Sequence, residues 1–218
     1  LIREIESGCG YVIVNNITYE NYLELADKIG IQQIQNNKGD KIISVKDKGR
    51  PMSSGGRYHQ GRDGGSIHTD CPHWEDIAGY VSLFCEEESF EGGETLLSFG
   101  KEIYKEMLHK HPKHVIILKE CFYFDRKEYK EGEPKTISKP VLFENNNNIC
   151  FRYLRDYIES GYKLENKKMS KQQVDALDAL DQIIKDKQIK LKLKKNDAIF
   201  FNNLNLLHGR TAFTNNIE

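Results

Sequence analysis

The chain has 218 residues, of which 38% are hydrophobic and 10% aromatic, enough for one domain with a sizeable buried core. Its 32 basic and 33 acidic residues leave a formal charge of −1, so no global field directs it to nucleic acid or to an anionic membrane. Five dispersed cysteines without a C-x-x-C pair argue against a disulfide framework and indicate a reducing compartment. Because no signal peptide is visible and no apolar run approaches the ~20 residues of a membrane span, we expect a cytoplasmic protein with a small-molecule substrate. The sequence does not predict the oligomeric state.

The first third of the chain is predicted to hold two strands, one helix and a long loop. Apolar residues favour strands at 11–14 and 42–45. Helical spacing of apolar residues between a capping threonine and a terminal glycine favours a helix over 18–30. The stretch 46–65 is polar, glycine-rich and basic, and long loops of this kind inside a compact domain are usually functional or disordered. We therefore expect a loop there, on the approach to the motif that follows it.

The remainder is predicted to consist of short strands and two helices. A capping box formed by Ser170 and Gln173 opens the clearest helix, at 170–187, and a second helix is expected at 101–110. The predicted strands are 79–85, 96–97, 115–118, 121–124, 137–143, 149–153, 189–193 and 198–201. No linker or repeat interrupts the chain, so residues 1–218 are expected to form a single domain. Many short strands with a few helices outside them are typical of a β-barrel or jelly roll.

The stretch 66–70 places His68 and Asp70 two residues apart, directly after the glycine-rich loop. On an extended strand, residues i and i+2 point to the same face, so both side chains can aim at one point. A catalytic metal needs a third ligand, and the best candidate is His208, which follows an apolar run that begins at 199. Two histidines and one carboxylate are the ligand set of non-haem Fe(II) oxygenases. Taken alone, an H-x-D triplet also occurs in solvated loops, so the interpretation depends on the rest of the chain.

Other features favour the metal interpretation, among them Pro72, which ends the strand, and the run Gly-Arg-Thr-Ala-Phe after His208. Together with the pieces below, they make the chain resemble the TauD/TfdA-like Fe(II)/2-oxoglutarate-dependent dioxygenases, in the branch that includes clavaminate synthase and γ-butyrobetaine hydroxylase. The order and spacing of these pieces match that family over nearly the whole chain. The matching pieces are Ile67-His68-Thr69-Asp70, Glu91-Gly92-Gly93-Glu94-Thr95, Phe151-Arg152-Tyr153, the run 196–203 and the run 207–213.

The resemblance implies a mainly β fold with flanking α-helices, namely a double-stranded β-helix of the jelly-roll, cupin-like type. Fe(II) would be held at its mouth by His68, Asp70 and His208, while 2-oxoglutarate would chelate two of the open positions and leave one for O2. The implied reaction oxidises, most simply by hydroxylation, an unactivated C–H bond of a small polar metabolite such as a free or carrier-bound amino acid, with release of succinate and CO2. Related halogenases lack the carboxylate, so Asp70 favours hydroxylation, desaturation or ring closure over halogenation.

The resemblance also suggests how 2-oxoglutarate would be bound. Thr95 matches the family's threonine that hydrogen-bonds the distal carboxylate of 2-oxoglutarate, although a threonine here can also simply finish a Gly-Gly turn. The family pairs the same carboxylate with an arginine about a dozen residues beyond the distal histidine, in the bidentate geometry that arginine serves best. The sequence ends at Glu218, ten positions after His208, so we expect it to be incomplete at its C-terminus. Arg210 is a candidate substitute, or a contact to substrate.

Three further residues are candidates for substrate binding. Arg152 and Arg155 lie where this family often places substrate contacts, and an arginine near the iron suits a carboxylate-bearing substrate such as an amino acid. A surface pair of arginine and aspartate is an equally good interpretation of this stretch. His59 lies on the loop that would cover the site and is either a substrate contact or a plain loop residue.

Two other functions are compatible with parts of the sequence. One is a non-catalytic, metal-binding β-barrel that keeps the three ligands but has lost 2-oxoglutarate binding. The other is a structural zinc site formed by His68, Asp70, Cys71 and His73, which the intervening proline and the lack of a second cysteine pair make the poorer interpretation. The tract of His109, His111 and His114 is more typical of a solvated helix end than of a metal site.

Overall fold

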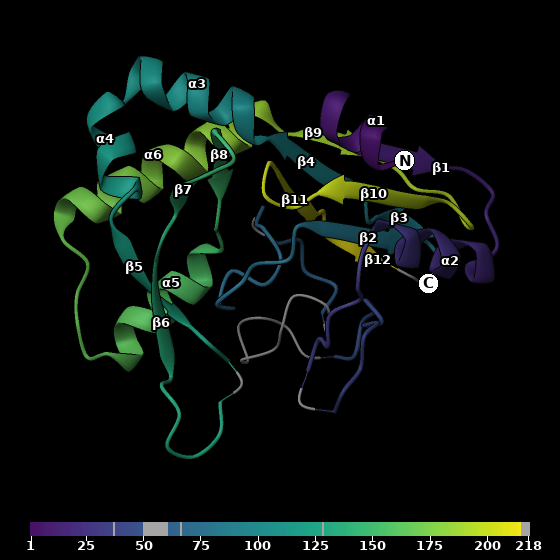
Figure 1. Ribbon diagram of the computed structural model, residues 1–218, viewed down its shortest axis with the longest axis horizontal. Coiled ribbons are helices and arrows are strands. Elements are labelled where there is room, and N and C mark those ends of the chain that lie inside the picture. The colour runs from purple at the N-terminus through teal and green to yellow at the C-terminus, as the bar shows by residue number, and fades with distance from the viewer. Residues whose placement is uncertain (37, 50–60, 66, 128, 215–218) are drawn as a thin grey trace.

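The computed structural model describes residues 1–36, 38–49, 61–65, 67–127 and 129–214, and its elements are labelled in Figure 1. Its helices are α1 (Ile2–Ser7), α2 (Tyr19–Ile29), α3 (Gly100–Lys110), α4 (Pro112–Leu118), α5 (Arg155–Leu164) and α6 (Lys171–Lys187). Its strands are β1 (Tyr11–Val14), β2 (Tyr80–Phe84), β3 (Glu91–Gly92), β4 (Thr95–Phe99), β5 (Cys121–Asp125), β6 (Thr136–Pro140), β7 (Leu142–Asn145), β8 (Asn148–Phe151), β9 (Ile189–Leu191), β10 (Ala198–Asn202), β11 (Leu206–Arg210) and β12 (Phe213–Thr214).

Two three-stranded antiparallel sheets form the frame of the fold. Sheet A has the strand order β1-β10-β2, and sheet B has the order β11-β4-β9. The turn after β10 leads directly into β11, so one short connection joins the two sheets. Between the sheets lies an apolar cluster built around Leu97, Ile199, Phe201 and Leu206. Side chains alternate between the two faces of a strand, so residues two positions apart, such as Ile199 and Phe201 in β10, both point into the space between the sheets.

Helices cover the outer faces of both sheets. In sheet A the alternate residues Ala198 and Phe200 pack against Ile5 of α1 and Tyr22 of α2. In sheet B the outer residues Leu96 and Leu207 belong to the large cluster that includes α3, α4 and α6. Figure 1 shows α3, α4 and α6 grouped at one end of the molecule and α1 and α2 at the other. The expectation of many short strands with helices outside them is therefore confirmed.

A second group of elements lies beside the sheets and consists of two hairpins and α5. Strand β5 pairs with β6, and β7 pairs with β8. Helix α5 crosses directly over β5, because Gly161 brings its backbone against the strand. A Cβ at position 161 would lie only 2.2 Å from the carbonyl oxygen of Tyr123, so no larger residue allows this packing.

Most of the predicted elements are present. Thr18 caps α2 through a hydrogen bond from the Asn21 amide, and Ser170 and Gln173 form the expected capping box of α6. The predicted strand at 42–45 is wrong, since this segment has no regular structure and two of its apolar residues remain exposed. The predicted strand at 115–118 is also wrong, because these residues form α4. Pro112 starts that helix, and Val115 and Leu118 are buried at a helical spacing of three.

The predicted strand at 137–143 is in fact two strands, β6 and β7, which the buried Val141 separates. Helices α1 and α5 were not predicted. The expected loop at 46–65 has no helix or strand in its described parts, and its segment 50–60 lies outside the described residues.

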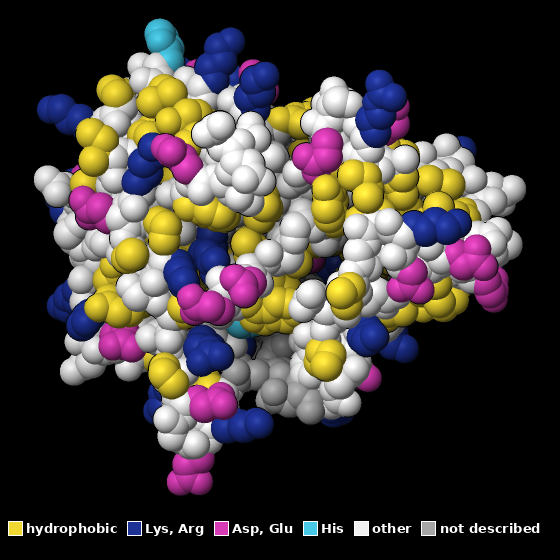
Figure 2. Space-filling model, in the orientation of Figure 1, with side chains coloured by type: hydrophobic (Ala, Val, Ile, Leu, Met, Phe, Trp, Pro, Cys, Tyr) yellow, Lys and Arg dark blue, Asp and Glu magenta, His cyan; other side chains and the backbone are white. Residues whose placement is uncertain are grey.

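The charges are distributed as the balanced composition predicts. On the face drawn in Figure 2, basic and acidic side chains are interspersed and form no large patch of one sign. Within the part of the chain that the structure describes, no helix is both long and apolar enough to cross a membrane.

Candidate metal centre

His68 and His208 are brought together by the backbone. His208 lies in β11, and His68 forms an isolated antiparallel bridge with it. Each residue donates its main-chain N–H to the carbonyl oxygen of the other, at 2.8 Å in both directions. Opposite residues of an antiparallel bridge point their side chains to the same face, and the two imidazole centroids are accordingly 4.6 Å apart.

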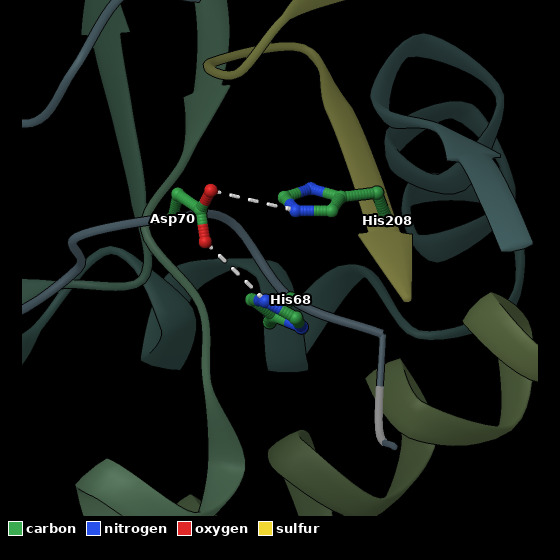
Figure 3. Close-up of side chains that lie close together, drawn as sticks. All are labelled: His68, Asp70 and His208. Carbon is green, nitrogen blue, oxygen red and sulfur yellow. Dashed lines mark ion pairs between the residues drawn. The ribbon is translucent and has the colours of Figure 1, made fainter. Parts of the chain in front are cut away.

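Asp70 completes the group, and its two carboxylate oxygens point one toward each imidazole ring (Figure 3). One carboxylate oxygen, Oδ1, lies 3.5 Å from Nε2 of His68, and the other, Oδ2, lies 3.7 Å from Nε2 of His208. Donor atoms of the three residues all lie within 4.8 Å of one another. Both imidazoles are buried, while the Asp70 side chain is 40% exposed. The three groups thus converge at a point that solvent can reach from the Asp70 side.

The segment before His68, residues 61–65, runs alongside the end of β11 and the residues after it. The Gly65 amide donates to the carbonyl oxygen of Arg210 at 2.9 Å, and the Phe213 amide donates to that of Arg62 at 3.1 Å. A glycine next to His208 leaves room for this close approach. A Cβ at Gly209 would lie 3.3 Å from both the Gly65 oxygen and the Ile67 side chain. The Gly in the His-Gly-Arg motif therefore positions His68, although His68 is far away in sequence.

The protonation states of the site suit metal binding. Burial raises the pKa of Asp70, but the neighbouring His208 and the hydrogen bond and charge of His68 outweigh burial and hold this pKa at about 2. Burial lowers the pKa of His208 to about 4, and the charge of Asp70 opposes this shift only in part. Near neutral pH, the Asp70 carboxylate is therefore ionised and the His208 imidazole is neutral, which are the forms that bind a metal ion.

The donor set fits a first-row transition metal. Adjacent ligands about 2.1 Å from such a metal lie about 3 Å apart in octahedral geometry. The separations of 3.5 Å and 3.7 Å around Asp70 exceed this value by less than one ångström, and no two donor atoms of the group lie more than 4.8 Å apart, so the three residues are close enough to share one ion. Two imidazoles and one carboxylate with an open side form the facial arrangement typical of non-haem Fe(II) oxygenases.

Thr95 and Arg210 share a face of sheet B with His208. They are direct register partners, because Thr95 of β4 lies opposite Arg210 of β11, two residues from His208. Thr95 is buried. The Arg210 guanidinium donates to the Gly61 carbonyl oxygen at 2.8 Å and lies 4.4 Å from the centroid of the Phe213 ring. The structure thus brings both predicted 2-oxoglutarate residues to the side of the sheet that carries the metal ligand.

The two arginines predicted to bind substrate have partners within the protein. Arg152 is buried, and its guanidinium donates to the carbonyl oxygens of Pro72, Trp74 and Glu75, just after Asp70 in the chain. The guanidinium of Arg155 bonds to three carboxylates, namely those of Glu159, Asp178 and Asp181. Their role in substrate binding stays a prediction, as does that of His59, which lies outside the described residues.

The structure gives no support to the zinc interpretation. Among the described residues, the one group of three or more metal-binding side chains is His68, Asp70 and His208, which includes neither Cys71 nor His73. Burial, with the negative charge of Asp70, raises the pKa of the Cys71 thiol, which disfavours its thiolate form. In the histidine tract, the rings of His111 and His114 stack at 5.3 Å, without a third donor in the described part of the chain.

Two residues near the site were not identified from the sequence. Asn203, which follows β10, is fully buried and hydrogen-bonds the main chain of Asp70. Asp156, in the first turn of α5, is exposed and close enough to His68 for their charges to interact. Nothing in the neighbouring sequence marks either residue as part of a site. Asn203 is one of several asparagines in its run, and Asp156 belongs to a helix that was not predicted.

Comparison with known proteins agrees with this geometry. FR-33289 synthase from Streptomyces rubellomurinus is 25% identical over 229 residues, which cover 98% of this chain but 66% of that protein. The chain thus spans slightly less than two thirds of the length of that relative.

Two solved structures have a fold similar to that of this chain. The non-haem iron oxygenase OrfP in complex with Fe, succinate and (3S)-hydroxy-L-Arg has a TM-score of 0.69 and 12% identity, over 98% of this chain and 74% of that one. An asparagine oxygenase in complex with Fe(II), 3-hydroxyasparagine and succinate has a TM-score of 0.59 and 15% identity, over 72% of this chain and 46% of that one.

The family match covers the whole site. The model of the taurine catabolism dioxygenase TauD, TfdA family matches residues 1–217, a range that contains all three converging side chains. This chain therefore belongs to the TauD/TfdA family.

Proposed function

We propose that this protein is an Fe(II)- and 2-oxoglutarate-dependent dioxygenase. The observation that carries the proposal is the convergence of His68, Asp70 and His208, whose donor atoms lie within 4.8 Å of one another. Membership of the TauD/TfdA family supports it. The reaction would oxidise, most simply hydroxylate, an unactivated C–H bond and release succinate and CO2.

We propose that the two sheets are the two halves of a double-stranded β-helix. Their inner faces share the apolar cluster around Leu97 and Phe201, and the short turn between β10 and β11 joins them. His208 projects from the inner face of sheet B, where its ring lies 4.7 Å from that of Phe201. The metal site would then lie at one end of the apolar core, which keeps bulk water from its inner side.

Each side chain of the site would have a definite role. The two imidazoles and the Asp70 carboxylate would hold iron on one side, and iron so bound supplies the activation of O2 that is coupled to oxidative decarboxylation of 2-oxoglutarate. Thr95 and Arg210, on the same face as His208, would hydrogen-bond the distal carboxylate of 2-oxoglutarate. Because Asp70 would occupy the third ligand position, hydroxylation, desaturation or ring closure is favoured over halogenation.

The proposed substrate is a small polar metabolite such as a free or carrier-bound amino acid. Two proteins of the same fold are described with hydroxylated asparagine and hydroxylated arginine, respectively. An amino-acid substrate carries an ammonium group, and Asp156 offers an exposed carboxylate in the neighbourhood of His68. We propose that Asp156 is the anionic contact for that group.

The test is formation of succinate from 2-oxoglutarate in the presence of Fe(II), O2 and a panel of amino acids. The wild-type protein should form succinate, and His68→Ala, Asp70→Ala and His208→Ala should each abolish it while the circular dichroism spectrum is unchanged. His109→Ala is the matched control, because His109 is exposed near the end of α3 and lies outside the three-residue site. Turnover that survives any of the three ligand substitutions would refute the proposal. Metal binding by the wild type without succinate formation would instead favour the non-catalytic β-barrel.

A further inference from the structure

The side-chain amide of Asn203 hydrogen-bonds both the main-chain N–H and the main-chain carbonyl oxygen of Asp70. Its Oδ1 accepts from the Asp70 N–H at 2.8 Å, and its Nδ2 donates to the Asp70 carbonyl oxygen at 3.1 Å. The same Nδ2 also donates to the carbonyl oxygen of Ala78 at 2.8 Å. Both N–H groups and the oxygen of this amide therefore have partners, and the residue is fully buried. Because an amide both donates and accepts at this spacing, neither aspartate nor leucine can replace it without leaving a buried group unpaired.

The backbone of Asn203 and of its neighbour is anchored to the frame of the fold near β2 and β8. The Asn203 N–H donates to the carbonyl oxygen of Gly79, just before β2, at 2.9 Å. Its neighbour Leu204 accepts a hydrogen bond from the Phe151 amide at 2.8 Å. Asn203 thus belongs to the turn that connects β10 to β11, the strand that holds His208.

Asp70, in contrast, lies outside every strand and helix. In the described part of the chain, the hydrogen bonds of its main-chain N–H and carbonyl are those to Asn203. Thr69, the residue before it, is held by the main chain of Tyr153: its N–H donates to the Tyr153 carbonyl oxygen at 2.8 Å, and its hydroxyl accepts from the Tyr153 N–H at 2.9 Å. Among the described residues, the hydrogen bonds that directly hold the Asp70 main chain therefore all come from one side-chain amide.

We propose that Asn203 is a positioning residue for the metal centre, which holds the Asp70 carboxylate at the distance from His208 that a single metal ion requires. The proposal rests on the proposed function only in taking the three residues as metal ligands. Residues that orient a metal ligand without touching the metal typically change metal affinity by about 10–100-fold when replaced. An effect of that size is expected here.

The experiment compares two neighbouring buried asparagines. Asn202 is 8% exposed, and its amide bonds to Glu6 and to the Leu204 N–H without contact to Asp70. Anaerobic Co(II) affinity is measured by chelator competition for the wild type and for Asn203→Ala, Asn203→Asp and Asn202→Ala, together with the Co(II) absorption spectrum and the melting temperature. We expect both Asn203 variants to lose about tenfold or more in Co(II) affinity and to change the spectrum. Asn202→Ala should lower the melting temperature but keep the affinity within about twofold of the wild-type value.

Folded Asn203 variants with wild-type Co(II) affinity and spectrum would overturn the proposal. It would also be overturned if both Asn203 variants fail to fold while Asn202→Ala folds, because Asn203 would then determine folding rather than ligand position. Failure of the wild type itself to bind Co(II) would count against the proposed function, and so the two failures are distinguishable.

Discussion

His68 and His208 exchange both of their main-chain hydrogen bonds at 2.8 Å, although 140 positions separate them in the chain. This one bridge fixes two of the three candidate ligands relative to each other before any metal binds. The third, Asp70, is placed by the residue spacing and by Asn203. The site is thus held by the backbone, and its three residues are close enough to share one ion.

Substitution of Gly209 should disturb the site through its neighbours. The side chain of Gly209→Val would press on the Gly65 carbonyl and on Ile67, which precedes His68. Overpacking of this kind costs about 1–3 kcal/mol of unfolding free energy, and displacement of His68 should also weaken Co(II) binding. Urea denaturation and Co(II) titration measure the two effects. Gly30→Ala is the control, since a Cβ there meets nothing within 4 Å, and equal behaviour of the two variants would contradict the account.

Substitution of Thr95 or Arg210 should weaken the binding of 2-oxoglutarate without changing the affinity for the metal. Thr95→Val keeps the shape of the side chain but removes its hydroxyl, and a hydrogen bond to a charged group is worth about 1.5–3 kcal/mol. We expect the Kd for 2-oxoglutarate to rise about tenfold or more for Thr95→Val and for Arg210→Ala, with Co(II) affinity unchanged.

Thr136→Val serves as the control for these variants, because Thr136 bonds to Glu165 in the group of elements formed by the two hairpins and α5. Calorimetric titration of 2-oxoglutarate into the Co(II)-loaded proteins gives the Kd values. A wild-type Kd in both site variants would remove these residues from the 2-oxoglutarate site.

Metal binding should stabilise the fold by an amount that grows with the logarithm of the free metal concentration. An ion that binds only the native state adds about 2.7 kcal/mol at 100 times its Kd. We expect Co(II) to raise the melting temperature of the wild type and of His109→Ala, whereas His208→Ala should show no rise. A similar rise in His208→Ala would mean that the ion binds elsewhere.

The buried Asp125 should make the fold sensitive to acid. Burial raises its pKa, but hydrogen bonds from Ser160 and from Lys127, whose ammonium lies 2.9 Å from the carboxylate, outweigh burial and hold the pKa below its usual range. Because the unfolded-state pKa of an aspartate is about 3.9, this stabilisation is complete above that value and is lost as the pH falls through the lower, folded-state pKa.

The urea unfolding free energy should therefore fall more steeply below about pH 4 in the wild type than in Asp125→Asn. Asp27→Asn, which removes an exposed carboxylate from α2, should follow the wild-type curve. Parallel curves for the wild type and Asp125→Asn would contradict the assignment.

The sequence alone was sufficient to predict features that depend on residues close together in the chain. The Thr18 cap and the capping box of Ser170 and Gln173 depend on residues three positions apart, and both are present. The pairing of His68 with Asp70 likewise follows from a spacing of two. His208 was found as the third member because its surrounding motif is specific, and the structure brings it to the other two.

The sequence failed where the decisive contact is distant. The run 115–118 has the composition of a strand, yet burial of Val115 and Leu118 against α6 and its neighbours makes it helical. Helix α5 depends on the close packing of Gly161 on β5, which no local pattern shows. The role of Asn203 rests on a bond across 133 residues, and only the folded chain places that amide beside Asp70.

The most direct test of the central claim is the anomalous scattering of a crystal soaked anaerobically with Fe(II), measured at the iron absorption edge. We predict one peak within about 2.3 Å of a nitrogen of His68, a nitrogen of His208 and an oxygen of Asp70. An iron peak bound elsewhere, or one that contacts the pair at 68 and 70 without His208, would contradict it.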